Sequence, residues 1–133
     1  EYLPVIENLP KLRRVQVIHV ENDCALELIE RYNEVADAFL LDSGKTMGAN
    51  PQFGGTGKVH DWTISKQFVQ STDLPVYLAG GLSPGNVFRA ITEVRPAGVD
   101  VCSGVRSNDT LDSEKVQAFV KEVKRADDAI NQQ

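Results

Sequence analysis

The chain contains 133 residues, of which 41% are apolar and 25% are charged, and its formal net charge is −5. This length and apolar content predict one globular domain over residues 1–133 and exclude an intrinsically disordered chain. The chain is net acidic and contains no block of Lys and Arg residues, so we do not expect nucleic acid as a partner. No apolar run reaches the about 18 residues that span a bilayer, so we do not expect a membrane as a partner.

The first part of the chain predicts a strand, a helix and a second strand. Residues 15–20 (VQVIHV) are β-branched and compact, which is typical of a strand buried on both faces. Asn22 and Asp23 can cap a following helix, whose apolar face is expected to carry Ala25, Leu28 and Ile29. Residues 38–42 predict the second strand, which ends in the carboxylate of Asp42.

The middle of the chain predicts a long loop, a helix, a third strand and another helix. Residues 43–60 are rich in Gly and show no apolar period, whereas Asp61 can cap a helix that carries Ile64, Phe68 and Val69. A third strand over residues 76–79 ends at Gly80–Gly81. Ser83–Pro84 has the residue types of a helix start, and the apolar stripe of that helix is Val87, Ala90, Ile91 and Val94.

The C-terminal part predicts a fourth strand over residues 98–102 and a final helix capped by Asp112. The core face of this helix is expected to carry Val116, Phe119, Val120 and Val123. Repeated strand–helix units with nearly continuous apolar strands predict an α/β fold, in which helices cover a parallel sheet. An open doubly wound sheet and an arc of a (β/α)₈ barrel both satisfy the pattern, and no dinucleotide-binding fingerprint favours the first.

Glycine-rich turns follow the third and fourth predicted strands, at the end where parallel α/β proteins bind their ligands. Gly80–Gly81 and Ser103–Gly104 each stand between a strand and a helix. Glycine lets the backbone approach an anion, and N–H groups at such turns bind phosphate. One pair alone is better explained by a tight turn, but two pairs on successive strands favour phosphate binding.

The segment GGTGK, with Gly54, Gly55, Gly57 and Lys58, does not match a nucleotide-binding P-loop. Val59 follows the lysine where the motif requires Ser or Thr, and the first glycine of the motif is missing. Long loops in compact domains are often active-site lids, so the functional interpretation is a mobile lid over a substrate. A surface loop without a role is the alternative.

Two acidic residues are candidates for chemistry at the strand ends. Asp42 follows the apolar run AFLL, and apolar neighbours raise the pKa of a carboxyl group, as a general acid requires. The alternative for Asp42 is an ordinary ionised capping residue. Asp100 lies between Val99 and Val101 and is expected on the opposite face of the strand, either at the site or as a structural hydrogen-bonding group.

The histidines and cysteines are weaker candidates. His19 and His60 lie far apart in the sequence without the spacing of metal ligands, so we expect no metal site. Cys24 is expected in the core, and Cys102 is expected as a buried, inert thiol, with a place in the site as the alternative. Two cysteines without CxxC spacing do not form a disulfide framework, which predicts the reducing cytoplasm.

Four segments together resemble the phosphoribosylanthranilate isomerase family of tryptophan biosynthesis. They occur in the order of that family and are FLLDSG at Phe39–Gly44, FGGTGKVHDW at Phe53–Trp62, LAGGLSPGNV at Leu78–Val87 and GVDVCSGV at Gly98–Val105. The resemblance implies the C-terminal portion of a TIM (β/α)₈ barrel. It also implies an aldose–ketose isomerase that performs an Amadori rearrangement of N-(5-phosphoribosyl)anthranilate without metal or cofactor.

The resemblance further implies roles for individual residues. Asp42 matches the general acid of the family, and Asp100 matches an inward-facing Asp near the anthranilate end of the substrate. The phosphate-binding positions match Gly80, Gly81, Ser103 and Gly104. The general base of the family is a cysteine in a Lys-Ile-Cys-Gly-type stretch, which this chain lacks, and Cys102 stands where the family more often has Ser.

The predicted units make about half of a barrel, which needs eight strands and typically about 250 residues. We therefore expect the N-terminal strands and the general base to be absent, and the exposed edges to pair with a second copy or with an N-terminal half. A phosphorylated small molecule is the expected substrate. Two alternatives remain, namely a non-catalytic half-barrel that binds a sugar phosphate or acts as an assembly module, and a related isomerase of histidine biosynthesis.

Overall fold

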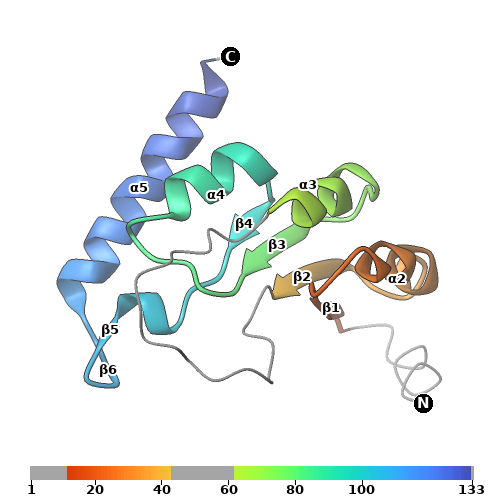
Figure 1. The fold of residues 1–133 in the computed structure, drawn as a ribbon, viewed down its shortest axis with the longest axis horizontal. Helices are drawn as coiled ribbons and strands as arrows, with labels where there is room; N and C mark the ends of the chain where they lie inside the picture. The colour runs from red at the N-terminus through yellow and green to blue at the C-terminus, as the bar shows by residue number, and fades with distance from the viewer. Residues whose placement is uncertain (1–11, 43–61, 133) are drawn as a thin grey trace.

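The computed structural model describes residues 12–42 and 62–132, which contain a parallel sheet flanked by helices (Figure 1). The sheet has four strands in the order β1–β2–β3–β4, and every neighbouring pair is parallel. A doubly wound sheet reverses its strand order at a switch point. The consecutive order of the described strands is instead that of an arc of a barrel, formed by β1 (Val15–His19), β2 (Ala38–Asp42), β3 (Val76–Ala79) and β4 (Gly98–Val99).

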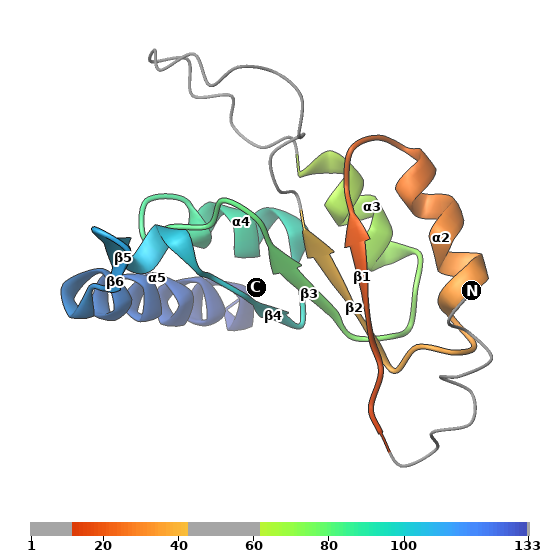
Figure 2. The ribbon, with the colours of Figure 1, turned by 90° about the horizontal axis from the view of Figure 1, so that it is seen from below.

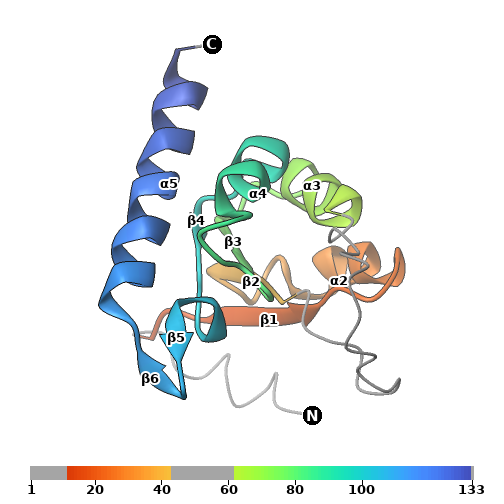
Figure 3. The same ribbon diagram turned by 60° about the vertical axis from the view of Figure 1, so that its left-hand side comes forward.

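Helices follow these strands in turn and lie next to one another around the sheet. They are α2 (Cys24–Tyr32), α3 (Thr63–Gln70), α4 (Val87–Val94) and α5 (Ser113–Asn131). α2 contacts α3, α3 contacts α4, and α4 contacts α5. Figure 3 shows α2, α3 and α4 along the outer side of the curved sheet. Within the described residues, no helix is long and apolar enough to cross a membrane.

The core lies between the sheet and these helices. Alternate strand residues face the helices and are almost fully buried, namely Ile18, Phe39, Leu41, Val76 and Leu78. Phe68 of α3 meets the ring of Phe39 edge to face, with ring centroids 5.1 Å apart. The apolar stripe predicted for α4 is confirmed, since all four of its residues are buried. Burying side chains of this size stabilises the fold by roughly 1.5–3 kcal/mol each, and it fixes the strands whose ends carry the candidate site.

The opposite face of the sheet is open in the part of the chain that the structure describes. Val15 and Val17 of β1 are 52% and 42% exposed, and Tyr77 of β3 is 39% exposed. The prediction that the first strand is buried on both faces is therefore wrong. The reason is that β1 is an edge strand among the described residues and that helices cover only one of its faces.

The loop after β3 also differs from the prediction. α4 begins at Val87 and not at Ser83–Pro84, because the preceding residues form a turn in which Asn86 has a non-helical φ of −130°. The Asn86 side chain accepts a hydrogen bond from the Ser83 N–H (2.8 Å) and donates one to the Gly81 carbonyl (3.0 Å). This asparagine therefore ties together the loop that carries the glycine pair.

The fourth strand is shorter than predicted. β4 ends at Val99, although the Asp100 N–H still donates to the Leu78 carbonyl (2.8 Å). The chain then forms a short 3₁₀ helix and an antiparallel hairpin, neither of which the sequence pattern predicts. These elements are η1 (Ser103–Val105), β5 (Arg106–Ser107) and β6 (Thr110–Leu111).

The predicted cap of the last helix, α5, is confirmed, but one of its predicted core residues is wrong. The Asp112 carboxylate accepts hydrogen bonds from the N–H groups of Glu114 and Lys115, both at 3.1 Å. Phe119 is buried as predicted, but Val120 is 43% exposed. α5 packs mainly on α4 and η1, so only a narrow stripe of the helix is covered and Val120 lies beside it.

Candidate functional site

The candidate site residues lie at the carboxyl ends of the strands. Figure 2 shows β1, β2 and β3 pointing to the same edge of the sheet. Asp42 is the last residue of β2, and Gly80–Gly81 follows β3 directly. Asp100 follows β4, and Ser103–Gly104 begins η1. The fold thus brings the acidic residues and the glycine pairs singled out from the sequence to one edge.

Asp42 faces the open side of the sheet. Its neighbour Leu41 is fully buried against the helices, so the alternation along β2 turns the Asp42 carboxylate to the opposite face. The side chain of Asp42 is 35% exposed. A carboxyl group in this position can exchange a proton with a ligand that lies on the open face.

His19 lies beside Asp42, a proximity that the sequence analysis missed. The two residues are partners in the parallel register of β1 and β2. His19 Nδ1 lies 3.9 Å from Asp42 Oδ2, and the histidine side chain is 72% exposed. A contact this exposed to solvent contributes little to stability. The signal that could have revealed the pair is that both residues are the polar last residues of consecutive strands.

Asp100 lies in the same row at the strand ends. Asp42 is the register partner of Ala79, and the hydrogen bond from the Asp100 N–H to the Leu78 carbonyl places Asp100 on the other side of Ala79. Neighbouring strands are about 4.8 Å apart, so the backbones of Asp42 and Asp100 are separated by about 10 Å. Asp42 and Asp100 therefore lie on either side of Ala79, which is itself buried.

Gly104 lies against the backbone of the loop that follows β3. A Cβ atom on Gly104 would lie 1.8 Å from the Leu82 carbonyl oxygen and 3.0 Å from Ser83 Cα, so only glycine fits between the loops. Gly80 and Gly81 have φ angles of 87° and 65°, which residues with a side chain rarely adopt. The loops after β3 and β4 therefore lie close together at the carboxyl ends of their strands, and we call their residues Gly80, Gly81, Ser103 and Gly104 the glycine cradle.

The two cysteines are not where the sequence analysis expects them. Both are free and exposed. Placing Cys24 in the core is wrong because Ala25 and Ile29 form the buried face of α2. The prediction of a buried Cys102 is also wrong, because the chain leaves the sheet before this residue and turns into η1.

The predicted lid lies outside the described residues. It comprises Gly54, Gly55, Gly57 and Lys58. His60 and Asp61 lie in the same segment. Their roles stay predictions from the sequence.

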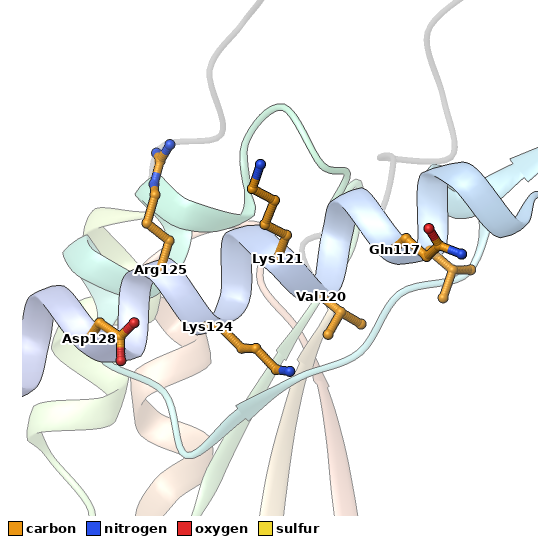
Figure 4. Close-up of a pocket in the computed structure, with 7 residues that line it drawn as sticks. Gln117, Val120, Lys121, Lys124, Arg125 and Asp128 are labelled. Atoms are coloured by element: carbon orange, nitrogen blue, oxygen red, sulfur yellow. The ribbon is translucent and has the colours of Figure 1, made fainter.

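A separate pocket of about 600 Å³ runs along α5 (Figure 4). Figure 4 shows Lys121 and Arg125 projecting from one side of the helix, and Val120 and Lys124 from the other. The lining belongs to this one helix and consists of Val116, Gln117, Val120, Lys121, Lys124, Arg125 and Asp128. It contains none of the candidate site residues, so this pocket is distinct from the site at the strand ends.

Comparison with known proteins identifies the family. The profile described as N-(5'-phosphoribosyl)anthranilate (PRA) isomerase matches residues 1–122. The chain belongs to the phosphoribosylanthranilate isomerase family. The N-(5'-phosphoribosyl)anthranilate isomerase of Methanocella arvoryzae is 43% identical over 117 residues, which cover 87% of this chain and 53% of that relative. The chain spans about half the length of the curated relatives it matches.

Two solved phosphoribosylanthranilate isomerases share the fold. The protein from Pyrococcus furiosus is 27% identical, with a TM-score of 0.68, and the match covers 92% of this chain and 57% of that one. A second, solved in complex with reduced 1-(o-carboxyphenylamino)-1-deoxyribulose 5-phosphate, is 27% identical with a TM-score of 0.68 and coverages of 89% and 52%. These matches confirm the predicted fold class, a TIM (β/α)₈ barrel of which the described units form a part.

Proposed function

We propose that this chain supplies the general acid and the phosphate cradle of a phosphoribosylanthranilate isomerase. The observation that carries the proposal is that Asp42 and both glycine turns lie at one edge of the parallel sheet in a member of this family. The ligand in one related structure has a phosphate at one end and a carboxyphenylamino group at the other. A substrate of this shape suits an edge that offers a glycine cradle and separate acidic groups.

Asp42 acts as the general acid of the Amadori rearrangement. Its carboxyl proton passes to the ring oxygen of the ribose while the bond between that oxygen and C1′ breaks. The electron pair of the broken bond stays on the oxygen, and the lone pair of the anthranilate nitrogen forms a C=N bond to C1′. A base then removes the C2′ proton to give the enamine, which tautomerises to the aminodeoxyribulose phosphate.

The glycine cradle holds the substrate phosphate through backbone N–H groups of Gly80, Gly81, Ser103 and Gly104. Glycine at these positions allows the phosphate to approach the backbone closely. Asp100 lies about two strand spacings from Asp42, roughly 10 Å, and serves the anthranilate end. The lid role of the GGTGK segment rests on the sequence alone.

The general base comes from outside these 133 residues. The sequence has no Lys-Ile-Cys-Gly-type stretch, and Cys24 is an exposed thiol on the outer helix layer. We propose that a second copy or an N-terminal half pairs with the sheet and covers its open face. The exposed Val15, Val17 and Tyr77 support this, because an apolar face of this kind favours association. Two free thiols also suit the reducing cytoplasm as the location.

Turnover of phosphoribosylanthranilate, followed by its fluorescence, tests the proposal. The chain is assayed alone and mixed with the part of the Methanocella arvoryzae relative that it does not match. We expect turnover in the mixture and a loss of about 10²–10⁴-fold in Asp42→Asn, as for removal of a general acid. Equal rates for wild type and Asp42→Asn would refute the role of Asp42. Binding of ribose 5-phosphate without turnover in the mixture would instead favour a non-catalytic half-barrel.

A further inference from the structure

We propose that His19 is a positioning residue for Asp42. Its Nδ1–H donates to Asp42 Oδ2 and leaves Oδ1 to carry the proton that goes to the substrate. This inference rests on the proposed role of Asp42 as the general acid. The observation that supports the inference is that the two side chains lie next to each other at the ends of β1 and β2.

The backbone fixes the two residues next to each other. His19 and Asp42 are the last register partners of β1 and β2. The pairing continues one step further, because the Val20 N–H donates to the Asp42 carbonyl (3.0 Å). Ile18 and Leu41, the preceding partners, are 2% and 0% exposed against the helices. The alternation along the two strands therefore directs both polar side chains to the open face, and the backbone pairing keeps their Cα atoms next to each other.

The side-chain geometry allows a hydrogen bond with little movement. The 3.9 Å between Nδ1 and Oδ2 exceeds a hydrogen bond by about 1 Å, a gap that a small rotation about the His19 side-chain bonds closes. Hydrogen bonds at catalytic sites often tighten only when the ligand is bound. Among the described residues, His19 is the side chain whose nitrogen lies next to the Asp42 carboxylate.

This contact matters most when Asp42 loses its proton. A hydrogen bond to a carboxylate is stronger than one to a neutral carboxyl group. The His19 N–H therefore stabilises the charge that develops on Asp42 in the transition state more than it stabilises the bound substrate. An interaction of this kind raises kcat and leaves KM nearly unchanged.

The ¹⁵N spectrum of the imidazole tests the contact without any activity assay. In the intact chain at neutral pH we expect His19 Nδ1 to carry a proton, because it donates to Asp42. In Asp42→Ala the acceptor is gone, and the signals should move to the Nε2–H form that free histidine prefers. Asp100→Ala, which removes the other carboxylate at the strand ends, is the matched control and should leave the His19 signals in place. An Nε2–H form in the wild type, or equal spectra in wild type and Asp42→Ala, would overturn the inference.

Kinetics of the mixed enzyme test the consequence. We expect His19→Ala to lower kcat about 10-fold, because the variant loses one hydrogen bond to a charged group in the transition state. KM should change less than about twofold. His19→Asn should restore most of the rate, because its Nδ2 can stand in the place of Nδ1. A rise in KM alone, or no rescue by His19→Asn, would contradict a positioning role. If the wild-type mixture shows no turnover, the proposed function fails, while the imidazole spectrum still decides whether His19 holds Asp42.

Discussion

The Gly104→Ala variant tests whether close contact between the loops after β3 and β4 is needed to bind phosphate. The added Cβ would lie 1.8 Å from the Leu82 carbonyl oxygen, whereas real Cβ contacts are not shorter than 3.0 Å. The loops must therefore separate by at least about 1.2 Å. The neighbouring atoms are backbone atoms of Leu82 and Ser83, which cannot swing aside as a flexible side chain does.

A separation of this size is enough to break one or two hydrogen bonds between N–H groups and a bound phosphate. Each such bond contributes about 1.5–3 kcal/mol, so we expect the affinity for inorganic phosphate to fall at least about 10-fold, and by roughly 10²-fold or more if two bonds are lost. The overpacked contact should also lower the free energy of unfolding by about 1–3 kcal/mol. Calorimetric titration with phosphate measures the first quantity, and urea unfolding measures the second.

Gly85→Ala is the matched control in the same loop. A Cβ atom there would lie 3.8 Å from Ser83 Oγ, an ordinary van der Waals contact. We expect its phosphate affinity and stability to match those of the wild type. A folded Gly104→Ala protein that binds phosphate as tightly as Gly85→Ala would refute the argument that the two loops form one cradle.

Three further substitutions test the core, the glycine loop and the cap of α5. Phe68→Ala removes a fully buried ring and should lower the free energy of unfolding by about 3–5 kcal/mol in urea. Asn86→Ala removes both side-chain hydrogen bonds of Asn86 within the glycine loop. The free energy of unfolding should fall by about 1–3 kcal/mol, and the affinity for phosphate should also fall. Hydrogen bonds from the Ser107 hydroxyl and two backbone N–H groups hold the pKa of Asp112 below its ordinary value of 3.8. The stabilisation is therefore complete above about pH 4 and is lost as the pH falls through the lowered pKa. Asp112→Asn, which keeps an oxygen to cap α5, should flatten this acid dependence in urea unfolding from roughly pH 7 to 2.

Local pattern was sufficient to predict most of the elements. Short, nearly continuous apolar runs predict β2 and β3, and the 3.6-residue period predicts the buried stripe of α4, because both patterns follow from the geometry of one element. The glycine pairs were found for the same reason, since a turn at a strand end has its own residue types. Asp42 stood out as a carboxylate closing an apolar run.

The missed features depend on neighbours that a local pattern does not contain. Whether Val17 is covered depends on what lies across the sheet, and the compact run VQVIH looks the same at an edge as in the middle. The proximity of His19 to Asp42 depends on strand register, which residue types alone do not fix. The start of α4 moved because a side chain of Asn86 ties back to the preceding turn.

NMR titration of the chain with reduced 1-(o-carboxyphenylamino)-1-deoxyribulose 5-phosphate, the ligand of one related structure, would show where a ligand of this shape binds. We expect chemical-shift changes concentrated at the strand ends, at Asp42, Gly80, Gly81, Ser103 and Gly104. Shifts confined to the pocket along α5, or no shifts at the strand ends, would contradict this expectation.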